Sequence, residues 1–237
     1  MSFTGWLQRR WSGVCDRTIG TEEFWRLAVD HQTAYDALKP MIQGNIRGVA
    51  LDIGAGRLAW RSLIAASADR YVATDAFETH PDIAFVSDVQ GNLPVADRTF
   101  DSVFCCSVLE HTQEPWKAFD EFYRVLKPGG RMVLSVPFLY YLHGQPSDYY
   151  RFTRYGIENL ARKSGFEIVE LRVAGGLGHS ALQALSMLTT SMLFHPAFPH
   201  AARGACWLLT RMARLVDAAD RSGLFAQSVN AVLKRPP

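Results

Sequence analysis

Residues 49–56 read Val-Ala-Leu-Asp-Ile-Gly-Ala-Gly. The residues before the first glycine form a short apolar run, which predicts a buried strand. A strand that ends in a glycine turn before a helix lets a bound molecule approach the backbone closely and meet the helix N-terminus. The stretch therefore indicates an α/β domain with a ligand site at the end of its first strand.

Outward from this stretch, predicted strands alternate with predicted helices. We expect strands at 49–53, 71–75, 83–86, 100–106, 131–137, 166–173 and 225–233. We expect helices at 58–68, 115–126 and 156–164, and an N-terminal helix that begins after Thr21 and ends near Pro40. Residues 127–130, Lys-Pro-Gly-Gly, predict a turn before the fifth strand. This alternation implies parallel strands with helices on both faces of one sheet.

Composition sets limits on the class of protein. The chain has 237 residues, of which 48% are hydrophobic and 20% charged, and its net charge is +2. These values are typical of a globular protein and predict no nucleic-acid partner. The four cysteines form no C-x-x-C pair, so we expect neither disulfides nor a metal site, and a cytoplasmic location. The N-terminal residues are too poor in apolar side chains to predict a signal peptide.

Several short motifs follow one another in a fixed order. They are Asp52-x-Gly54-x-Gly56, Asp75, Ser87-Asp88-Val89, residues 100–103, Leu109-Glu110-His111 and residues 124–130. Over residues 47–173 this series resembles the class I S-adenosylmethionine-dependent methyltransferases, specifically methyltransferase type 11. The resemblance implies a Rossmann-like, mostly parallel sheet of seven strands with helices on both faces. It also implies an antiparallel last strand, which here would follow a helical insertion.

The resemblance implies S-adenosylmethionine as cofactor and assigns the residues that hold it. The turn at Gly54, Ala55 and Gly56 would pass beneath the methionine part, anchored by Asp52. Asp75, followed by Ala76, would accept the ribose hydroxyls. The remaining cofactor residues would be Asp88 and Val89 at the adenine and Ser107 near the methionine end. The family often has a third glycine where this chain has Leu58, which we expect to start the helix.

A loop rich in aromatic residues, 137–153, follows the fifth strand. It resembles the H-x-x-P-x-D-Y-Y-R-[FY]-T signature of a subset of this family, many of whose members are linked with glycan or lipid-linked sugar pathways. We expect His143, Asp148 and His111 to be catalytic, with His143 the preferred general base. The expected acceptor-binding residues are Phe138, Tyr149, Tyr150 and Arg151. In the alternative interpretation, Asp148 and Arg151 pair to cap the next helix while the tyrosines pack.

Three functions are compatible with these motifs. The first is methyl transfer to a small-molecule or glycan- or lipid-linked acceptor, at a hydroxyl or an amine. The second is a nicotinamide-dependent enzyme, since Gly54-x-Gly56-x-x-Ala59 with Asp75 also fits a dinucleotide pattern. The third is a protein that binds S-adenosylmethionine without turnover. The complete set of cofactor motifs favours the first.

The expected organisation is a single methyltransferase domain over residues 1–237. It comprises an N-terminal helical cap (1–45), the cofactor-binding core (46–177), a helical insertion (178–224) and a closing strand and tail (225–237). The insertion carries apolar residues around most of a helix, followed by a basic amphipathic segment. We expect its apolar surface to be covered by the chain itself, by a second copy in a homodimer, or by peripheral membrane contact.

Overall fold

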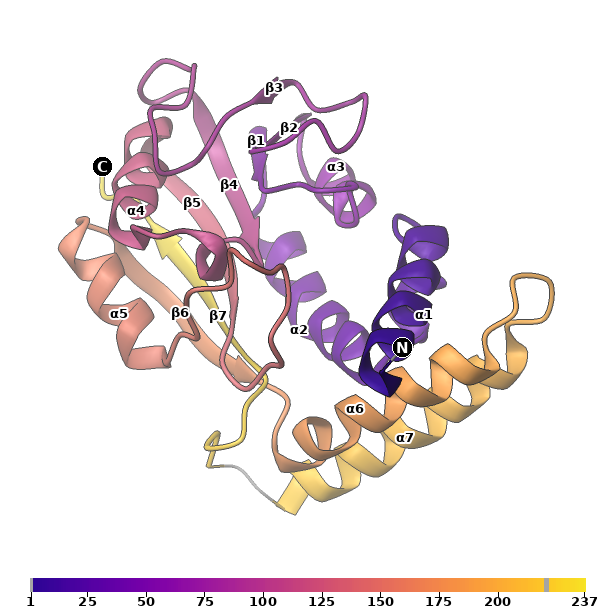
Figure 1. Cartoon of the computed structure of the whole chain (residues 1–237). Coiled ribbons are helices and arrows are strands. Elements are labelled where there is room, and N and C mark those ends of the chain that lie inside the picture. Colours follow the sequence, from indigo (N-terminus) through magenta and orange to yellow (C-terminus); the bar gives the residue numbers. More distant parts are fainter. Residues whose placement is uncertain (1, 220–221) are drawn as a thin grey trace. The chain divides into compact units, whose positions relative to one another are not determined.

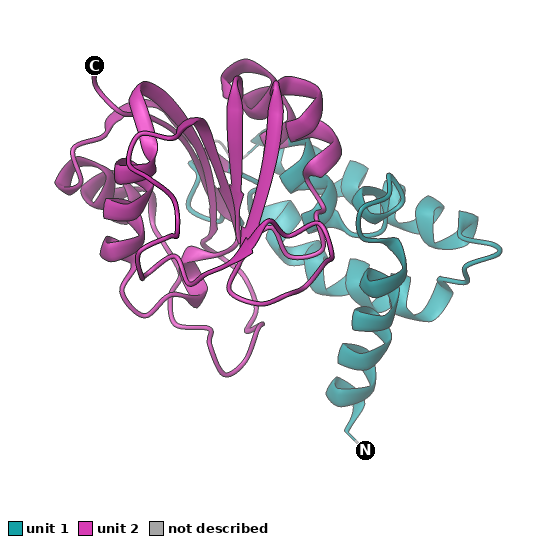
Figure 2. Cartoon of the chain, turned by 90° about the horizontal axis from the view of Figure 1, so that it is seen from above, with its two compact units in different colours: residues 1–36, 174–227 teal, residues 37–173, 228–237 magenta. Residues whose placement is uncertain are grey.

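The computed structural model describes residues 2–219 and 222–237. The chain divides into two compact units, shown in different colours in Figure 2. One comprises residues 1–36 and 174–227, and the other comprises residues 37–173 and 228–237. The single-domain organisation expected from the sequence stays a prediction.

A seven-stranded sheet, in the order β3-β2-β1-β4-β5-β7-β6, forms the centre of the second unit (Figure 1). Its strands are β1 (Val49–Ile53), β2 (Arg70–Asp75), β3 (Phe85–Val86), β4 (Phe100–Cys106), β5 (Leu126–Pro137), β6 (Glu167–Ala174) and β7 (Ser228–Lys234). The pairs β1–β2, β1–β4, β2–β3 and β4–β5 are parallel, whereas β7 pairs antiparallel with β5. This arrangement confirms the predicted fold class, including the antiparallel last strand.

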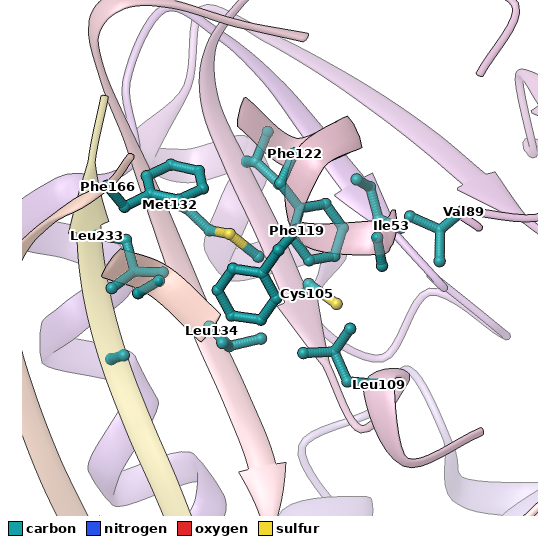
Figure 3. Close-up of a cluster of buried hydrophobic side chains, with 14 of the residues drawn as sticks. Ile53, Val89, Cys105, Leu109, Phe119, Phe122, Met132, Leu134, Phe166 and Leu233 are labelled. Atoms are coloured by element: carbon teal, nitrogen blue, oxygen red, sulfur yellow. The ribbon is translucent and has the colours of Figure 1, made fainter. Parts of the chain in front are cut away.

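Helices cover both faces of the sheet. Cys105 of β4 lies in the main hydrophobic cluster with Phe119 and Phe122 of α4 (Pro115–Val125), as Figure 3 shows. The preceding residue, Phe104, contacts Trp60, which directly precedes α3 (Arg61–Ser67). Successive side chains of a strand point to opposite faces, so α3 and α4 lie on opposite sides. Helix α5 (Arg154–Lys163) contacts α4. Each large apolar side chain that these elements bury stabilises the folded state by about 1.5–3 kcal/mol.

Several predicted boundaries are wrong, among them the helix start expected after Thr21, because the helix begins at Val29. Helix α2 runs from Val29 to Asn45 and continues through Pro40, which was expected to end it. Proline inside a helix costs about 3 kcal/mol, but Leu38 and Ile42 on either side of it are completely buried. Strand β5 begins at Leu126, so residues 127–130, which were expected to form a turn before the strand, are part of it. Gly129 keeps the turn-like positive φ of 76° that the sequence predicted there.

The first unit is helical. It contains α1 (Phe3–Thr18), the 3-10 turn η1 (Phe24–Arg26), α6 (Leu177–Leu193) and α7 (His200–Ala219). Helices α6 and α7 contact each other and lie between β6 and β7 in the chain, which confirms the predicted helical insertion. None of the described helices has the length and hydropathy needed to cross a membrane.

The buried side of α6 is largely polar. Thr190 Oγ1 donates a hydrogen bond to the Leu27 carbonyl, and Ser186 Oγ accepts one from Val29 N. Several large apolar side chains of the two helices are exposed instead: Leu185, Met192, Leu193, Trp207, Leu208, Met212, Leu215 and Val216. Apolar surface therefore remains uncovered within this unit.

Candidate active site

The glycine turn after β1 has the conformation that its residues predict. Gly54 and Gly56 have φ values of 68° and 53°, in the left-handed region that glycine adopts without strain. Gly54 N and Ala55 N both donate to the Thr74 carbonyl of β2, at 2.9 and 3.0 Å. A Cβ atom at Gly54 would lie 2.1 Å from Val108 Cγ2. The glycine turn therefore passes so close to Val108 that position 54 requires glycine.

Leu58 also adopts a left-handed conformation, with φ at 60°. The expectation that it starts the helix is wrong, because α3 begins at Arg61. Leu58 thus adopts a left-handed conformation that favours glycine, while its side chain is buried among Ala55 and Ala73. A leucine in this conformation carries backbone strain.

Asp75, at the end of β2, connects the glycine turn to the following loop. Its Oδ2 accepts from Gly56 N at 2.8 Å, and its Oδ1 accepts from Phe77 N at 3.1 Å. A carboxylate has about four acceptor positions, so two remain after these backbone bonds. The Asp75 side chain can therefore hold the turn and still accept two hydroxyl groups.

Asp52 lies behind the turn and is 3% exposed. Its Oδ2 accepts a hydrogen bond of 2.7 Å from the Tyr71 hydroxyl. Burial raises the pKa of the Asp52 carboxyl to about 7, the charge of Asp75 adds to the increase, and the Tyr71 hydrogen bond opposes it. A cationic group beside this carboxyl would stabilise its ionised form.

A cavity of about 660 Å³ opens at the carboxyl ends of β1, β2 and β4. Its lining includes eight of the residues expected at the site: Gly54, Asp75, Ala76, Asp88, Val89, Ser107, His111 and Tyr149. Asp88 is exposed there, and its carboxylate accepts from the backbone and side-chain amides of Gln90. The structure thus brings together most of the expected cofactor residues around one cavity.

The other expected residues do not line this cavity. Asp52, Ala55 and Gly56 lie in or behind the turn, and Phe138 and Tyr150 pack against the main hydrophobic cluster. His143, Asp148 and Arg151 form a group of their own, described below. The cavity lining that the sequence analysis missed includes Phe77, Gln90, Thr112, Gln113, Gln145, Pro146 and Ser147. Three of them, residues 145–147, lie two to four positions after His143 in the aromatic loop. Their place in that loop is the sequence feature that could have identified them.

The aromatic loop is held by an ion pair. Arg151 donates from Nη1 to Asp148 Oδ1 at 2.6 Å and from Nη2 to Oδ2 at 2.8 Å. Asp148 Oδ2 also accepts from His143 N at 2.7 Å. The Arg151 guanidinium, together with the His143 N–H, holds the pKa of the Asp148 carboxyl well below its usual range. Thr153, rather than Asp148, caps α5 through Gly156 N, so the pair organises the loop and does not cap the helix.

Comparisons with known proteins find methyltransferases. Residues 51–134 match the model of a family described as a methyltransferase domain. A demethylmenaquinone methyltransferase of Clavibacter sepedonicus is 32% identical over 139 residues, which are 52% of this chain and 53% of that protein. An uncharacterised methyltransferase of Mycolicibacterium vanbaalenii is 34% identical over 95 residues, 36% of this chain and 37% of that protein. The chain thus spans about half, or less, of the length of these relatives.

Solved structures share the fold at low identity. A Burkholderia thailandensis 1,6-didemethyltoxoflavin-N1-methyltransferase, with bound 1,6-didemethyltoxoflavin and S-adenosylhomocysteine, has a TM-score of 0.54 and 14% identity over 86% of this chain and 79% of its own. The [4+2]-cyclase SpnF has a TM-score of 0.57 and 18% identity over 86% of this chain and 82% of its own. The ordered motifs, the sheet topology and the match over residues 51–134 make this chain similar to the class I S-adenosylmethionine-dependent methyltransferases.

Proposed function

We propose that this chain transfers the methyl group of S-adenosylmethionine to a small-molecule or a glycan- or lipid-linked acceptor, at a hydroxyl or an amine. The observation that carries this proposal is the Gly54–Gly56 turn, tied to Asp75 by the Gly56 N–H at the edge of the cavity. The Clavibacter relative is named for demethylmenaquinone and the Burkholderia structure for 1,6-didemethyltoxoflavin, so both names specify small-molecule acceptors.

The residues of the cavity fit the cofactor. The two acceptor positions that Asp75 has left suit the two hydroxyls of a ribose. Asp52, behind the turn, would anchor it beneath the methionine part, and Asp88 with Val89 would hold the adenine. Gly54 lets the turn pack against Val108, where a Cβ atom would lie 2.1 Å from Val108 Cγ2. These assignments use the acidic groups for cationic or hydroxyl-bearing parts of the ligand, as their chemistry requires.

The protein's contribution to the reaction is mainly alignment. The cofactor supplies a sulfonium whose methyl group is already activated for transfer. The acceptor's lone pair forms the new bond to the methyl carbon, while the electron pair of the carbon–sulfur bond returns to sulfur and the acceptor releases a proton. Holding the acceptor in line with the carbon–sulfur bond is the largest effect available to the chain.

A hydroxyl acceptor additionally needs help in losing its proton. The sequence analysis preferred His143 for this role, but His111 is the histidine that lines the cavity. We therefore place His111 nearer the acceptor and assign His143, Asp148 and Arg151 to the support of the loop. Tyr149 also lines the cavity and remains our proposed acceptor contact.

Calorimetric titration with S-adenosylmethionine and, separately, with NAD tests the cofactor. We expect binding of the first and none of the second. Asp75→Ala should weaken binding by about 2–4 kcal/mol, because it removes a charged acceptor and leaves the ligand's hydroxyls unpaired. Asp69→Ala is the matched control, since this exposed acid lies just before the start of the same strand. Equal affinities for all three proteins would refute the cofactor assignment.

Turnover needs its own measurement, because the same fold occurs in a protein named as a [4+2]-cyclase. Release of S-adenosylhomocysteine in the presence of candidate quinone, glycan and lipid-linked acceptors measures it directly. Binding of S-adenosylmethionine without release for any acceptor class would favour the non-catalytic alternative.

A further inference from the structure

Three potential metal ligands meet at the carboxyl ends of two neighbouring strands. Glu110 and His111 belong to the short 3-10 turn η2 (Leu109–His111) that follows β4. His143 lies in the loop after β5, which pairs parallel with β4. Adjacent parallel strands end at the same edge of a sheet, so residues distant in sequence become neighbours there.

The distances between their ligand atoms are short. His143 Nε2 lies 3.5 Å from Glu110 Oε1, and His111 Nε2 lies 3.9 Å from the same oxygen. One ligand atom from each residue falls within 4.8 Å of the others. Two ligands that each bind an ion at about 2.1 Å are separated by at most about 4.2 Å. The two histidine–glutamate distances already satisfy this limit.

The Glu110 carboxyl group is completely buried without hydrogen-bond partners among the described residues. A buried, unpaired carboxylate is strongly unfavourable unless a cation or a proton compensates it. The nearby Arg151 is engaged in its paired hydrogen bonds to Asp148. Glu110 is thus a buried carboxyl group without a hydrogen-bond partner among the described residues, and its Oε1 lies 3.5 and 3.9 Å from two imidazole nitrogens.

Both imidazoles present the nitrogen that a metal ion would need. His111 Nδ1 lies 2.6 Å from the Ser147 carbonyl oxygen, and His143 Nδ1 lies 3.2 Å from the Tyr141 carbonyl oxygen. A carbonyl only accepts hydrogen bonds, so these contacts favour the hydrogen on Nδ1, and in the neutral imidazole that leaves the lone pair on Nε2. His143 Nδ1 also lies 3.5 Å from Arg151 Nη2 and 3.5 Å from Asp148 Oδ2. Metal-binding histidines are oriented by outer partners in this way.

The backbone around the cluster is built for close approach. Gly144 has a φ of 65°, and a Cβ atom there would come within 2.5 Å of His111 Cε1. The Glu110 carbonyl accepts from the backbone N–H groups of Tyr149 and Tyr150, which fixes the loop over the turn. The three side chains are therefore held in place without any ligand.

We propose that Glu110, His111 and His143 bind a divalent first-row transition-metal ion beside the cavity. Two imidazoles and a carboxylate suit ions such as Zn²⁺, Co²⁺, Mn²⁺ or Fe²⁺, and three protein ligands leave open positions. This proposal replaces the prediction, made from the cysteine pattern, that the chain has no metal site. The two histidine lone pairs then serve the ion and do not act as general bases.

The site's role in turnover rests on the proposed function. Because His111 also lines the cavity, an open coordination position there would take the oxygen of a hydroxyl-bearing acceptor. The ion would act as a Lewis acid, so that the hydroxyl releases its proton to water as the oxygen attacks the methyl carbon.

Metal binding is tested on the full chain after treatment with a chelator. Titration with Co²⁺, followed by its visible absorption, and calorimetric titration with Zn²⁺ should each show one bound ion per chain. Glu110→Gln, His111→Gln and His143→Gln should each weaken binding by at least about 100-fold, since loss of an outer partner alone costs about 10–100-fold. His80→Gln, a histidine outside the cluster, should bind as the wild type does.

S-adenosylmethionine titration of the same variants shows whether each is folded and separates the two proposals. Metal binding without cofactor binding would refute the proposed function and leave the metal site standing. Cofactor binding by a wild-type chain that binds no ion would overturn the metal site. So would metal affinities that the three cluster substitutions leave unchanged, because the ion would then be bound elsewhere. Loss of thermal stability in Glu110→Gln or His143→Gln without any metal signal would identify a buried ion pair instead.

Discussion

Replacing Leu58 with glycine and, separately, with alanine tests the conformation of the cofactor turn. Leu58 has a φ of 60° and is 5% exposed, so its backbone is strained while its side chain is well packed. Both substitutions remove the same packing with Ala55 and Ala73, at a cost of about 2–5 kcal/mol. Only glycine also removes the strain of the left-handed conformation, which is about 1–2 kcal/mol for other residues.

The difference between the two variants isolates the backbone. Elsewhere alanine is more stable than glycine by about 0.5–1 kcal/mol, because glycine loses more conformational freedom on folding. At position 58 the strain outweighs this entropy, so Leu58→Gly should be more stable than Leu58→Ala by about 0.5–1 kcal/mol. At position 58 glycine should thus be the more stable of the two residues, whereas alanine is the more stable at an ordinary position.

Urea unfolding at constant pH measures the difference in the free energy of unfolding between the two variants. The transition is monitored with a spectroscopic probe in the unit that contains the sheet. Gly44→Ala is the matched control: Gly44 lies inside α2, and a Cβ atom there would meet nothing within 4 Å. We expect that substitution to raise stability in the ordinary direction. A Leu58→Ala variant more stable than Leu58→Gly would refute the left-handed conformation of Leu58.

Three further predictions concern charge and surface. Because the folded-state pKa of Asp52 is raised to about 7, its contribution to stability is complete below its ordinary pKa and is lost as pH rises to about 7. Unfolding titrations should show a loss of about 1.4 kcal/mol per pH unit within that interval, absent in Asp52→Asn. Asp148→Asn should abolish acceptor turnover, measured as S-adenosylhomocysteine release, with cofactor affinity unchanged in calorimetry; equal losses of both would contradict a loop-specific role. Liposome flotation should carry the chain with anionic vesicles if 178–224 contacts a membrane, whereas a chain wholly in the soluble fraction favours a dimer, measured by analytical ultracentrifugation.

Local patterns sufficed for the sheet and its turn. The apolar run before Gly54 predicts β1, and the positive φ values of both glycines follow from their lack of a Cβ atom. The same reasoning failed at Pro40, where burial of neighbouring side chains outweighs a missing backbone hydrogen bond. It also failed at Leu58, because the residue type does not indicate the left-handed conformation, with φ at 60°, that it adopts in the folded turn.

The fold class and the order of the cofactor motifs could be predicted from the sequence, since each motif consists of residues close together in the chain. Which side chains of different motifs meet depends on how the strands and loops pack in three dimensions. Glu110 and His143 come within 3.5 Å only because β4 and β5 end at one edge of the sheet and the loop after β5 folds back over η2. No spacing rule for cysteines or histidines detects such a group, because its ligands are brought together by strand pairing rather than by their separation along the chain.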